Sequence, residues 1–221
     1  MRRELEAVIF DLDGVIADTA KLHYMAWKKL AFEIGIDLKE EFNEKLRGVE
    51  RMESLGLILS LSDISYNNVE KRELANRKNR YYLNLIENIT PDELLPGAID
   101  CFKMLGGKKI KMVLASMSKN ALDVIKRLKI EGYFDYVISG MDILKSKPDP
   151  EIFIKSARGI KVSTENCVGV EDAVAGILAI NSCGMFSVGV GKKEVLNMAD
   201  VFIKDLSEFD IDKIREIGGF V

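Results

Sequence analysis

The chain has 221 residues, of which 48% are hydrophobic and 30% are charged, and its formal net charge is −3. This balance excludes a disordered chain, argues against non-specific nucleic-acid binding, and leaves no apolar run long enough to span a bilayer. The three cysteines are far apart and form no C-x-x-C pair, which favours reduced thiols over a disulfide framework or a zinc site. We therefore expect a globular, cytoplasmic protein that binds neither nucleic acid nor membranes.

The first predicted element is a strand over residues 7–10, Ala-Val-Ile-Phe, which is apolar without alternation. This pattern is typical of a strand buried on both faces of a parallel sheet. Asp11 and Asp13 follow at its carboxyl end, where open α/β sheets place their active sites. On extended chain both carboxylates would point to the same side, so one needs a proton, a cation or a substrate hydrogen nearby. The alternative interpretation is a polar turn.

Residues 17–90 have a helical texture and no convincing strand. Asp18 and Thr19 predict a helix N-cap, and apolar residues continue at helical spacing as far as Gly35, a natural stop. Further helix-like segments are expected at about 40–46, 50–61 and 67–88. Because this block follows the first strand directly, we predict that it forms a helical cap over the carboxyl edge of the sheet, with hinges near 14–18 and 88–96.

From residue 91 onward, strand and helix patterns alternate. Strands are expected at 111–115, 136–139, 167–170, 185–190 and 201–203, with helices at 118–129, 151–158 and 173–181. Repeated β-α-β alternation predicts an α/β fold with a doubly wound, mostly parallel sheet. The predicted core domain is therefore residues 1–16 and 91–221, with an inserted α-helical cap domain at 17–90.

Polar residues follow the ends of several predicted strands and should converge at one edge of the sheet. They are Asp11, Asp13, Ser116, Lys147, Glu171 and Asp172. Clustered carboxylates suit Mg²⁺, and a hydroxyl and an ammonium beside the metal suit a phosphate. The pattern predicts phosphoryl transfer, with Asp11 as nucleophile and Asp13 as acid and base.

Each of these residues also has a structural alternative when taken alone. Ser116 suits a helix cap, Lys147 a solvated loop, and the acidic pair 171–172 the start of the next helix. Their joint occurrence at successive strand ends favours the functional interpretation.

The same residues carry a resemblance to a known family. D-L-D-G-V at 11–15, Ser116, Lys147 and E-D at 171–172 match, in order, the four motifs of the haloacid-dehalogenase superfamily. The helical insertion resembles that superfamily's C1-type cap, and the core would be Rossmann-like.

This resemblance assigns a role to each motif. Asp11 would become an aspartyl phosphate, Asp13 would be the general acid/base, and Ser116 and Lys147 would hold the transferring phosphoryl group. Mg²⁺ would be bound by Asp11, by the backbone carbonyl of Asp13 and by Asp172, with Glu171 close by.

Finer motifs are similar to the β-phosphoglucomutase family within that superfamily. They are D-T-A-x-x-H-x-x-A-W at 18–27, R-G-V-E-R at 47–51, R-K-N at 77–79 and L-A-S-M-S-K-N at 114–120. The resemblance implies an isomerase that interconverts β-glucose 1-phosphate and glucose 6-phosphate. It also implies Mg²⁺ and β-glucose 1,6-bisphosphate, the activating intermediate, as cofactors, and a small sugar phosphate as the substrate. The alternative is a sugar-phosphate or phosphoglycolate-type phosphatase, and a phospho-accepting receiver is disfavoured because receivers lack an inserted cap.

A mutase that handles a bisphosphate needs a second phosphate site. Arg51 of the cap could form it with Ser118, Lys119 and Asn120 of the core, because guanidinium suits phosphate geometry. A phosphate that bridges the two domains would favour closure and exclude water.

The resemblance also implies roles for other cap residues. Thr19 and His23 would couple substrate binding to the position of Asp13, and Lys78 would reach the closed site. The sugar would be lined by Arg47, Gly48, Val49 and Trp27. Structural alternatives are a helical histidine without a ligand, a core tryptophan, and a solvated lysine.

Three positions depart from the family pattern. Arg47 stands where the family usually has Lys, Glu50 replaces a small polar residue, and Met117 replaces Ala. These departures bear on sugar preference more than on reaction class. Finally, the lack of a long exposed apolar stripe favours a monomer.

Overall fold

The computed structural model describes residues 3–221, which contain one six-stranded sheet in the order β3-β2-β1-β4-β5-β6. Every pairing between neighbouring strands is parallel. The strands are β1 (Ala7–Phe10), β2 (Lys111–Ser116), β3 (Tyr136–Ser139), β4 (Cys167–Glu171), β5 (Phe186–Val190) and β6 (Val201–Ile203). The predicted doubly wound, parallel α/β fold is confirmed, and its strand order is Rossmann-like.

The helices follow the predicted alternation with four differences. They are α1 (Ala20–Glu33), α2 (Arg51–Leu59), α3 (Asn68–Ile86), α4 (Ala98–Gly107), α5 (Ala121–Arg127), α6 (Glu151–Gly159), α7 (Val174–Ser182) and α8 (Ile211–Gly218). The segment near 40–46 is a 3₁₀-helix, Glu40–Lys45, and α5 is shorter than the predicted 118–129. The sequence analysis did not anticipate α4 or α8. Further 3₁₀ turns lie at Pro91–Glu93, Glu131–Tyr133, Thr164–Asn166 and Leu206–Glu208.

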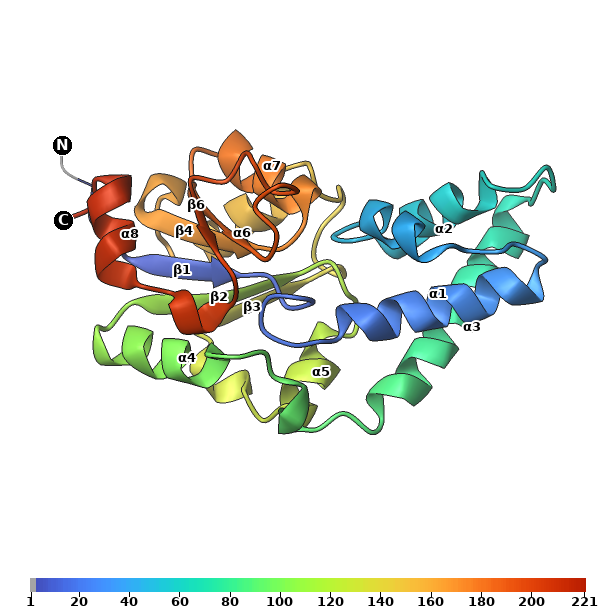
Figure 1. Cartoon of the computed structure of the whole chain (residues 1–221), viewed down its shortest axis with the longest axis horizontal. Coiled ribbons are helices and arrows are strands. Elements are labelled where there is room, and N and C mark those ends of the chain that lie inside the picture. The colour runs from blue at the N-terminus through green and yellow to red at the C-terminus, as the bar shows by residue number, and fades with distance from the viewer. Residues whose placement is uncertain (1–2) are drawn as a thin grey trace.

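Helices cover both faces of the sheet (Figure 1), and a layer of hydrophobic side chains lies on each face. Because side chains alternate along a strand, Val8 and Phe10 of β1 join the layer under α4, α5 and α8. Ala7 and Ile9 join the layer under α6 and α7. All four side chains are fully buried, which explains why β1 is apolar at every position.

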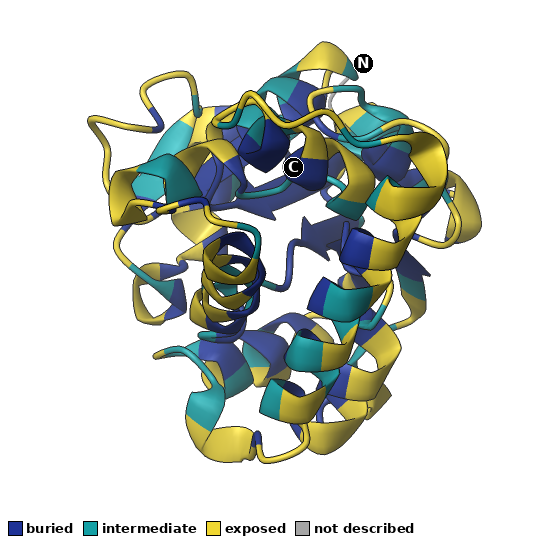
Figure 2. Ribbon diagram, turned by 90° about the vertical axis from the view of Figure 1, so that its right-hand side faces the viewer, coloured by how far each residue is buried: buried dark blue, intermediate teal, exposed yellow. Residues whose placement is uncertain are grey.

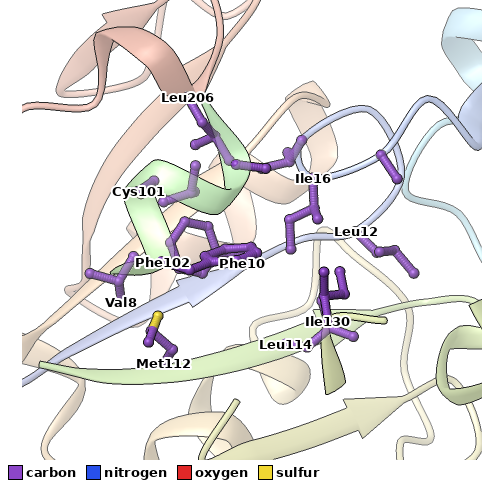
Figure 3. Packing of buried hydrophobic residues seen from close by; sticks show 14 of the residues in the cluster. Val8, Phe10, Leu12, Ile16, Cys101, Phe102, Met112, Leu114, Ile130 and Leu206 are labelled. Atoms are coloured by element: carbon purple, nitrogen blue, oxygen red, sulfur yellow. The ribbon is translucent and has the colours of Figure 1, made fainter. Parts of the chain in front are cut away.

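An aromatic contact anchors the first layer. The rings of Phe10 and Phe102 meet edge to face with centroids 5.6 Å apart. Figure 3 shows the pair with Val8 and Met112 around it. This contact fixes α4 against the strand that ends at the aspartates, so the core packing also positions the site.

The helices α1–α3 form a separate unit beyond the carboxyl end of β1 (Figure 1). They have a hydrophobic cluster of their own, which includes Trp27, Leu30, Leu55 and Leu74. Figure 2 looks onto this end of the molecule and shows exposed residues along the outer faces of the helices. We keep 17–90 as the proposed cap and 1–16 with 91–221 as the proposed core, of which residues 1 and 2 lie outside the described part.

Local signals explain where two of these helices end and begin. Gly35 has a φ of +77° just after the last residues of α1, as expected for a helix stop that glycine favours. Asn67 accepts hydrogen bonds from the amides of Val69 and Glu70, and Glu70 bonds back to the Asn67 amide. This capping box starts α3 at Asn68. Over residues 3–221, none of the helices has both the length and the apolar character needed to cross a bilayer.

Replacing Phe102 with alanine tests the core packing around β1. The side chain is fully buried, so Phe102→Ala should lower the free energy of unfolding by about 3–5 kcal/mol. Phe32→Ala is the matched control, because Phe32 is 82% exposed, and it should have little effect. Urea unfolding at pH 7.5 measures both values, and equal losses in the two variants would contradict this account of the core.

Candidate active site

The site lies where the sheet reverses its winding, between β1 and β4. Asp11 follows β1, Glu171 ends β4, and Asp172 comes next. One carboxylate oxygen from each of the three lies within 4.8 Å of the others, and all three residues are buried. Open α/β sheets bind ligands at such a switch point. The predicted convergence of Asp11, Glu171 and Asp172 at one edge is therefore present in the fold.

A buried lysine neutralises part of this negative charge. Lys147 Nζ lies 2.6 Å from Asp11 Oδ1 and 2.7 Å from Glu171 Oε2, and its side chain is fully buried. Burial by itself would lower the pKa of Lys147, but the two carboxylates outweigh it and hold this pKa above its usual value. The ammonium is therefore a permanent cation beside Asp11, and the solvated-loop interpretation of Lys147 is wrong.

Asp13 faces a different set of groups from Asp11. The strand ends at Phe10 and the chain bends at Leu12, so the extended geometry assumed from the sequence stops before Asp13. The Asp13 amide donates to Asp11 Oδ2 at 3.0 Å, whereas its carboxylate accepts from the hydroxyl of Thr19 at 2.6 Å. Thr19 takes the N-cap position of α1 but makes no side-chain cap bond there. The hydroxyl instead orients Asp13.

Two further groups complete the surroundings of the Asp13 carboxyl. Ser116 Oγ donates to it at 3.5 Å, and His23 Nε2 lies 3.7 Å from it. Burial, followed by the charge of Asp11, raises the pKa of Asp13 to about 6, and the Thr19 hydrogen bond opposes this rise. A carboxyl with a pKa near neutrality is suited to give and take protons at physiological pH.

The turn after the aspartates requires glycine. Gly14 has a φ of +87°, and a Cβ there would lie 2.0 Å from Asp172 Oδ2. A side chain at this position would push the Asp172 carboxylate out of the cluster. The glycine of the D-L-D-G sequence thus allows the turn after β1 to pack closely against Asp172, the residue that follows β4.

The acidic cluster fits a hard divalent cation such as Mg²⁺. Its donors are carboxylate oxygens, the ligands that Mg²⁺ prefers. Within residues 3–221, Asp172 Oδ2 is buried without a hydrogen-bond partner, although Arg47 Nη2 lies 3.0 Å away. The cluster does not include the Asp13 carboxylate, which is engaged with Thr19. A ligand role for Asp13 through its backbone carbonyl stays a prediction.

A pocket between the helical insertion and the core brings most of the predicted substrate residues together. Its predicted members are Asp11, Asp13, His23, Trp27, Arg47, Gly48, Val49, Arg51, Lys78, Ser118 and Lys119. Other residues support it from outside its lining. Thr19 and Ser116 contact Asp13, and Asn120 Nδ2 donates to Asn79 Oδ1 across the two parts at 2.9 Å.

A buried lysine, Lys78, contacts the partly buried His23 in this pocket. Lys78 is only 2% exposed, and its Nζ lies 2.9 Å from His23 Nδ1. The ammonium nitrogen also lies 4.6 Å from the ring centroid of Trp27. Burial and the charge of Arg51 lower the pKa of Lys78 to about 7. The solvated-face interpretation of Lys78 is therefore wrong, whereas Trp27 both packs in the helical cluster and lines the pocket.

The same contacts set the tautomer of His23. Burial, with the charges of Lys78 and Arg51, lowers the pKa of His23 well below its usual value, so the ring is neutral. If Nδ1 accepts from Lys78, the proton is on Nε2, which faces Asp13. The histidine thus links Lys78 of the helical insertion to the carboxyl of Asp13.

The sequence analysis missed some residues that support these groups. Tyr82 is fully buried and its ring lies against His23 with centroids 3.9 Å apart. It follows Lys78 by one helical turn, and this spacing was the available signal. Asn79 and Glu50, which the sequence marked only as part of the motif at 77–79 and as an unusual residue in the turn 47–51, also contact the core through Asn120 and Lys119.

Comparison with known proteins agrees with this site. The family model of haloacid dehalogenase-like hydrolases matches residues 5–184. The chain therefore belongs to this family, and the matched range contains all the residues assembled at the sheet edge.

Individual relatives narrow the similarity further. The chain is 44% identical to a β-phosphoglucomutase of Bacillus subtilis over 96% of this chain and 95% of that protein. It is 32% identical to a phosphorylated carbohydrates phosphatase of Thermotoga maritima, with 82% of each chain covered. A crystal structure of β-phosphoglucomutase from Clostridium difficile superimposes with a TM-score of 0.93 at 46% identity, covering 97% of both chains.

The low pKa of Lys78 predicts a pH dependence of stability. Between about pH 7 and the unfolded value of 10.5, the unfolded state holds one proton more at Lys78, so its contribution to stability rises with pH. Lys78→Met lacks this pH-dependent contribution, so the unfolding free energy of the wild type minus that of the variant should rise as pH rises through this window. Urea unfolding without metal from pH 7 to 9.5 measures it.

The matched control is Lys103→Met on the exposed face of α4. This variant should run parallel to the wild type over the same pH range. Parallel curves for Lys78→Met as well would contradict the assignment of a depressed pKa to Lys78.

Proposed function

We propose that this protein is a Mg²⁺-dependent β-phosphoglucomutase that interconverts β-D-glucose 1-phosphate and D-glucose 6-phosphate. One observation carries the proposal: a single pocket is lined by the acidic phosphoryl-transfer centre at Asp11 and by a second group of cations, Arg51 and Lys119. A phosphatase needs the first set, whereas a mutase that turns over a bisphosphate needs both. The similarity to β-phosphoglucomutases over nearly the whole chain supports the same activity.

Asp11 is the proposed nucleophile. Lys147 holds its Oδ1 in place and neutralises charge next to it. One Asp11 oxygen attacks the phosphorus in line, a bond to phosphorus forms, and the bond to the sugar oxygen breaks. Ser116 and Lys147 are the proposed partners of the phosphoryl oxygens. Mg²⁺ bound by Asp11, Asp172 and the backbone carbonyl of Asp13, with Glu171 nearby, would supply further neutralisation of the phosphoryl charge.

Asp13 moves the proton in both half-reactions. As the phosphoryl group passes to Asp11, the protonated Asp13 donates its proton to the leaving sugar oxygen. In the second half-reaction it accepts the proton of the attacking sugar hydroxyl. A pKa of about 6 allows both forms at neutral pH, and Thr19 and His23 hold the carboxyl in position.

The second phosphate of β-glucose 1,6-bisphosphate would bind between the proposed cap and core. Arg51 comes from α2, whereas Ser118 and Lys119 lie after β2. A phosphate held from both sides favours closure, and closure excludes water that would otherwise hydrolyse the aspartyl phosphate. Arg47, Gly48 and Val49 are proposed to line the sugar, with Trp27 and His23 opposite. Action in the cytoplasm as a monomer stays a prediction.

A sugar-phosphate phosphatase is the second candidate. It is favoured by the similarity to the phosphorylated carbohydrates phosphatase of Thermotoga maritima. The same Asp11, Asp13, Ser116, Lys147 and Asp172 would serve that reaction, with water in place of the second sugar.

A direct assay separates the two functions. Purified protein with Mg²⁺, β-glucose 1-phosphate and a trace of glucose 1,6-bisphosphate should form glucose 6-phosphate much faster than it releases inorganic phosphate. In the same assay, Arg51→Ala should reduce isomer formation far more than hydrolysis of a small phosphomonoester. Release of phosphate in excess of isomer by the wild type would assign the phosphatase function instead.

Asp13→Asn tests the proton-transfer role. The amide keeps the size of the side chain but neither donates nor accepts the reaction proton. Turnover should fall by about 10²–10⁴-fold. Binding of Mg²⁺, measured by calorimetry, should stay within a fewfold of wild type, since Asp13 is assigned a backbone contact only. Near-normal turnover would remove Asp13 from the mechanism.

A further inference from the structure

Several polar contacts join the helical insertion to the core, and two of them are ion pairs made by one short turn, 47–50. Arg47 Nη2 lies 3.0 Å from Asp172 Oδ2, and Lys119 Nζ lies 3.3 Å from Glu50 Oε1. Both core partners belong to the proposed ligand sites. Other contacts lie elsewhere on the boundary: Lys21 pairs with Glu93, Ser146 donates to the Glu53 carboxylate at 2.6 Å, and Asn120 donates to Asn79 at 2.9 Å.

We propose that the turn 47–50 holds the cap closed in the ligand-free protein by substituting for both charged ligands. Arg47 takes the place of the divalent cation at Asp172, and Glu50 takes the place of the distal phosphate at Lys119. The identities of these ligands rest on the proposed function. Metal and phosphate must therefore displace a built-in competitor before the site is loaded.

Arg47 is an incomplete substitute for a cation. The Asp172 side chain is 6% exposed, so its charge needs a counter-charge close by. Within the described chain, however, both Asp172 Oδ2 and Arg47 Nε lack a hydrogen-bond partner. The guanidinium balances charge without satisfying these polar atoms. A divalent cation with direct oxygen ligands satisfies the carboxylate better and can displace the guanidinium.

Gly14 makes room for this contact. A Cβ at Gly14 would lie 3.3 Å from Arg47 Nη2 as well as against Asp172 Oδ2. The glycine that the catalytic turn requires thus also allows a cap residue to reach the acidic cluster.

The Glu50 carboxylate is oriented toward Lys119 by its position at the N-cap of α2. Its Oε2 accepts a hydrogen bond from the amide of Met52 and caps α2, while its Oε1 faces Lys119. The carboxylate directly precedes Arg51 in sequence, so it lies among the cations proposed for the distal phosphate. A phosphate that binds Lys119 competes with a carboxylate whose orientation is already fixed.

The chemistry of the two side chains suits these roles. Arg47 presents a planar fork of donors to the Asp172 carboxylate, and Glu50 presents a carboxylate to Lys119. One short turn therefore carries both charge types, which gives the two residues a common role in the control of ligand entry and of the closed state.

The wild-type protein by itself allows a first test. Trp27 is the single tryptophan, lines the pocket and is 3% exposed, so acrylamide quenching of its fluorescence reports access to the pocket. Without ligand, quenching should be weak. Mg²⁺ alone should displace Arg47, loosen the cap and increase quenching, with a matching rise in the radius of gyration from solution scattering. No response to saturating Mg²⁺ in either measurement would overturn the proposal for Arg47.

Variants separate displacement from simple charge effects. Each pair stabilises only the ligand-free closed state, so its removal should tighten ligand binding. Arg47→Gln should bind Mg²⁺ about tenfold more tightly. Glu50→Gln should bind glucose 6-phosphate about two- to fivefold more tightly, as expected for a partly exposed pair. Without ligand, acrylamide should quench Trp27 more strongly in both variants than in the wild type. The expected level is the one that the wild type reaches with saturating Mg²⁺.

Matched controls keep the test specific. Glu73→Gln and Arg80→Gln each remove one partner of an exposed ion pair inside α3, away from the boundary with the core. Neither should change Mg²⁺ affinity or quenching by more than twofold. Tighter binding in the Arg47 and Glu50 variants without increased quenching would show charge removal alone and overturn the closure. The protein could show the expected Mg²⁺-dependent quenching and scattering and yet bind no glucose 6-phosphate. That result would refute the proposed function but not the closure by Arg47.

Discussion

The buried ammonium of Lys147 is the interaction on which the rest of the site depends. Asp11, Glu171 and Asp172 place three carboxylates within a few ångströms in the interior, where like charges repel strongly and water is excluded. Lys147 contacts two of them and so makes their burial tolerable. A bound divalent cation would neutralise what remains. The parallel pairing of β1 with β4 brings the acids together, and the lysine allows the fold to keep them there.

Asp13 connects this rigid cluster to the helical insertion. Its amide bonds to Asp11, whereas its carboxylate contacts Thr19 and faces His23, which in turn pairs with Lys78. A movement of α1 or α3 relative to the core therefore changes the surroundings of one aspartate and not those of the other. Under the proposed mechanism, the nucleophile Asp11 can stay fixed while the proton-transfer group Asp13 responds to the substrate. Two ion pairs cross the same boundary between insertion and core. Arg47 pairs with Asp172 at the proposed metal site, and Glu50 pairs with Lys119 at the proposed distal phosphate site.

The sequence analysis predicted the core of the fold well, because the relevant patterns are local. Uninterrupted apolar runs marked the buried strands, and polar residues marked their carboxyl ends. Helices α4 and α8 have no counterpart among the predicted helices. The predicted helix at 118–129 is longer than α5, because residues 118–120 form the loop that precedes α5 on the pocket side. The sequence analysis also treated Lys78 and Lys147 alone as candidates for solvated charges. Lys78 contacts His23, which is 55 residues away in the chain, and Lys147 contacts Asp11, which is 136 residues away. Their burial depends on these distant partners, so a local sequence pattern cannot predict it.

The amino-acid sequence by itself determined the alternation of strands and helices, the order of the four motifs and the choice of Asp11 and Asp13 as the proposed catalytic pair. These features depend on residue type and on spacing within one element or one turn. The tertiary structure alone decided which charges meet: Lys147 with Asp11, Lys78 with His23, Arg47 with Asp172 and Glu50 with Lys119. The physical reason is that burial and electrostatic coupling arise only between segments that folding brings together, and it is these couplings that move the pKa values of Asp13 and Lys78 toward neutrality.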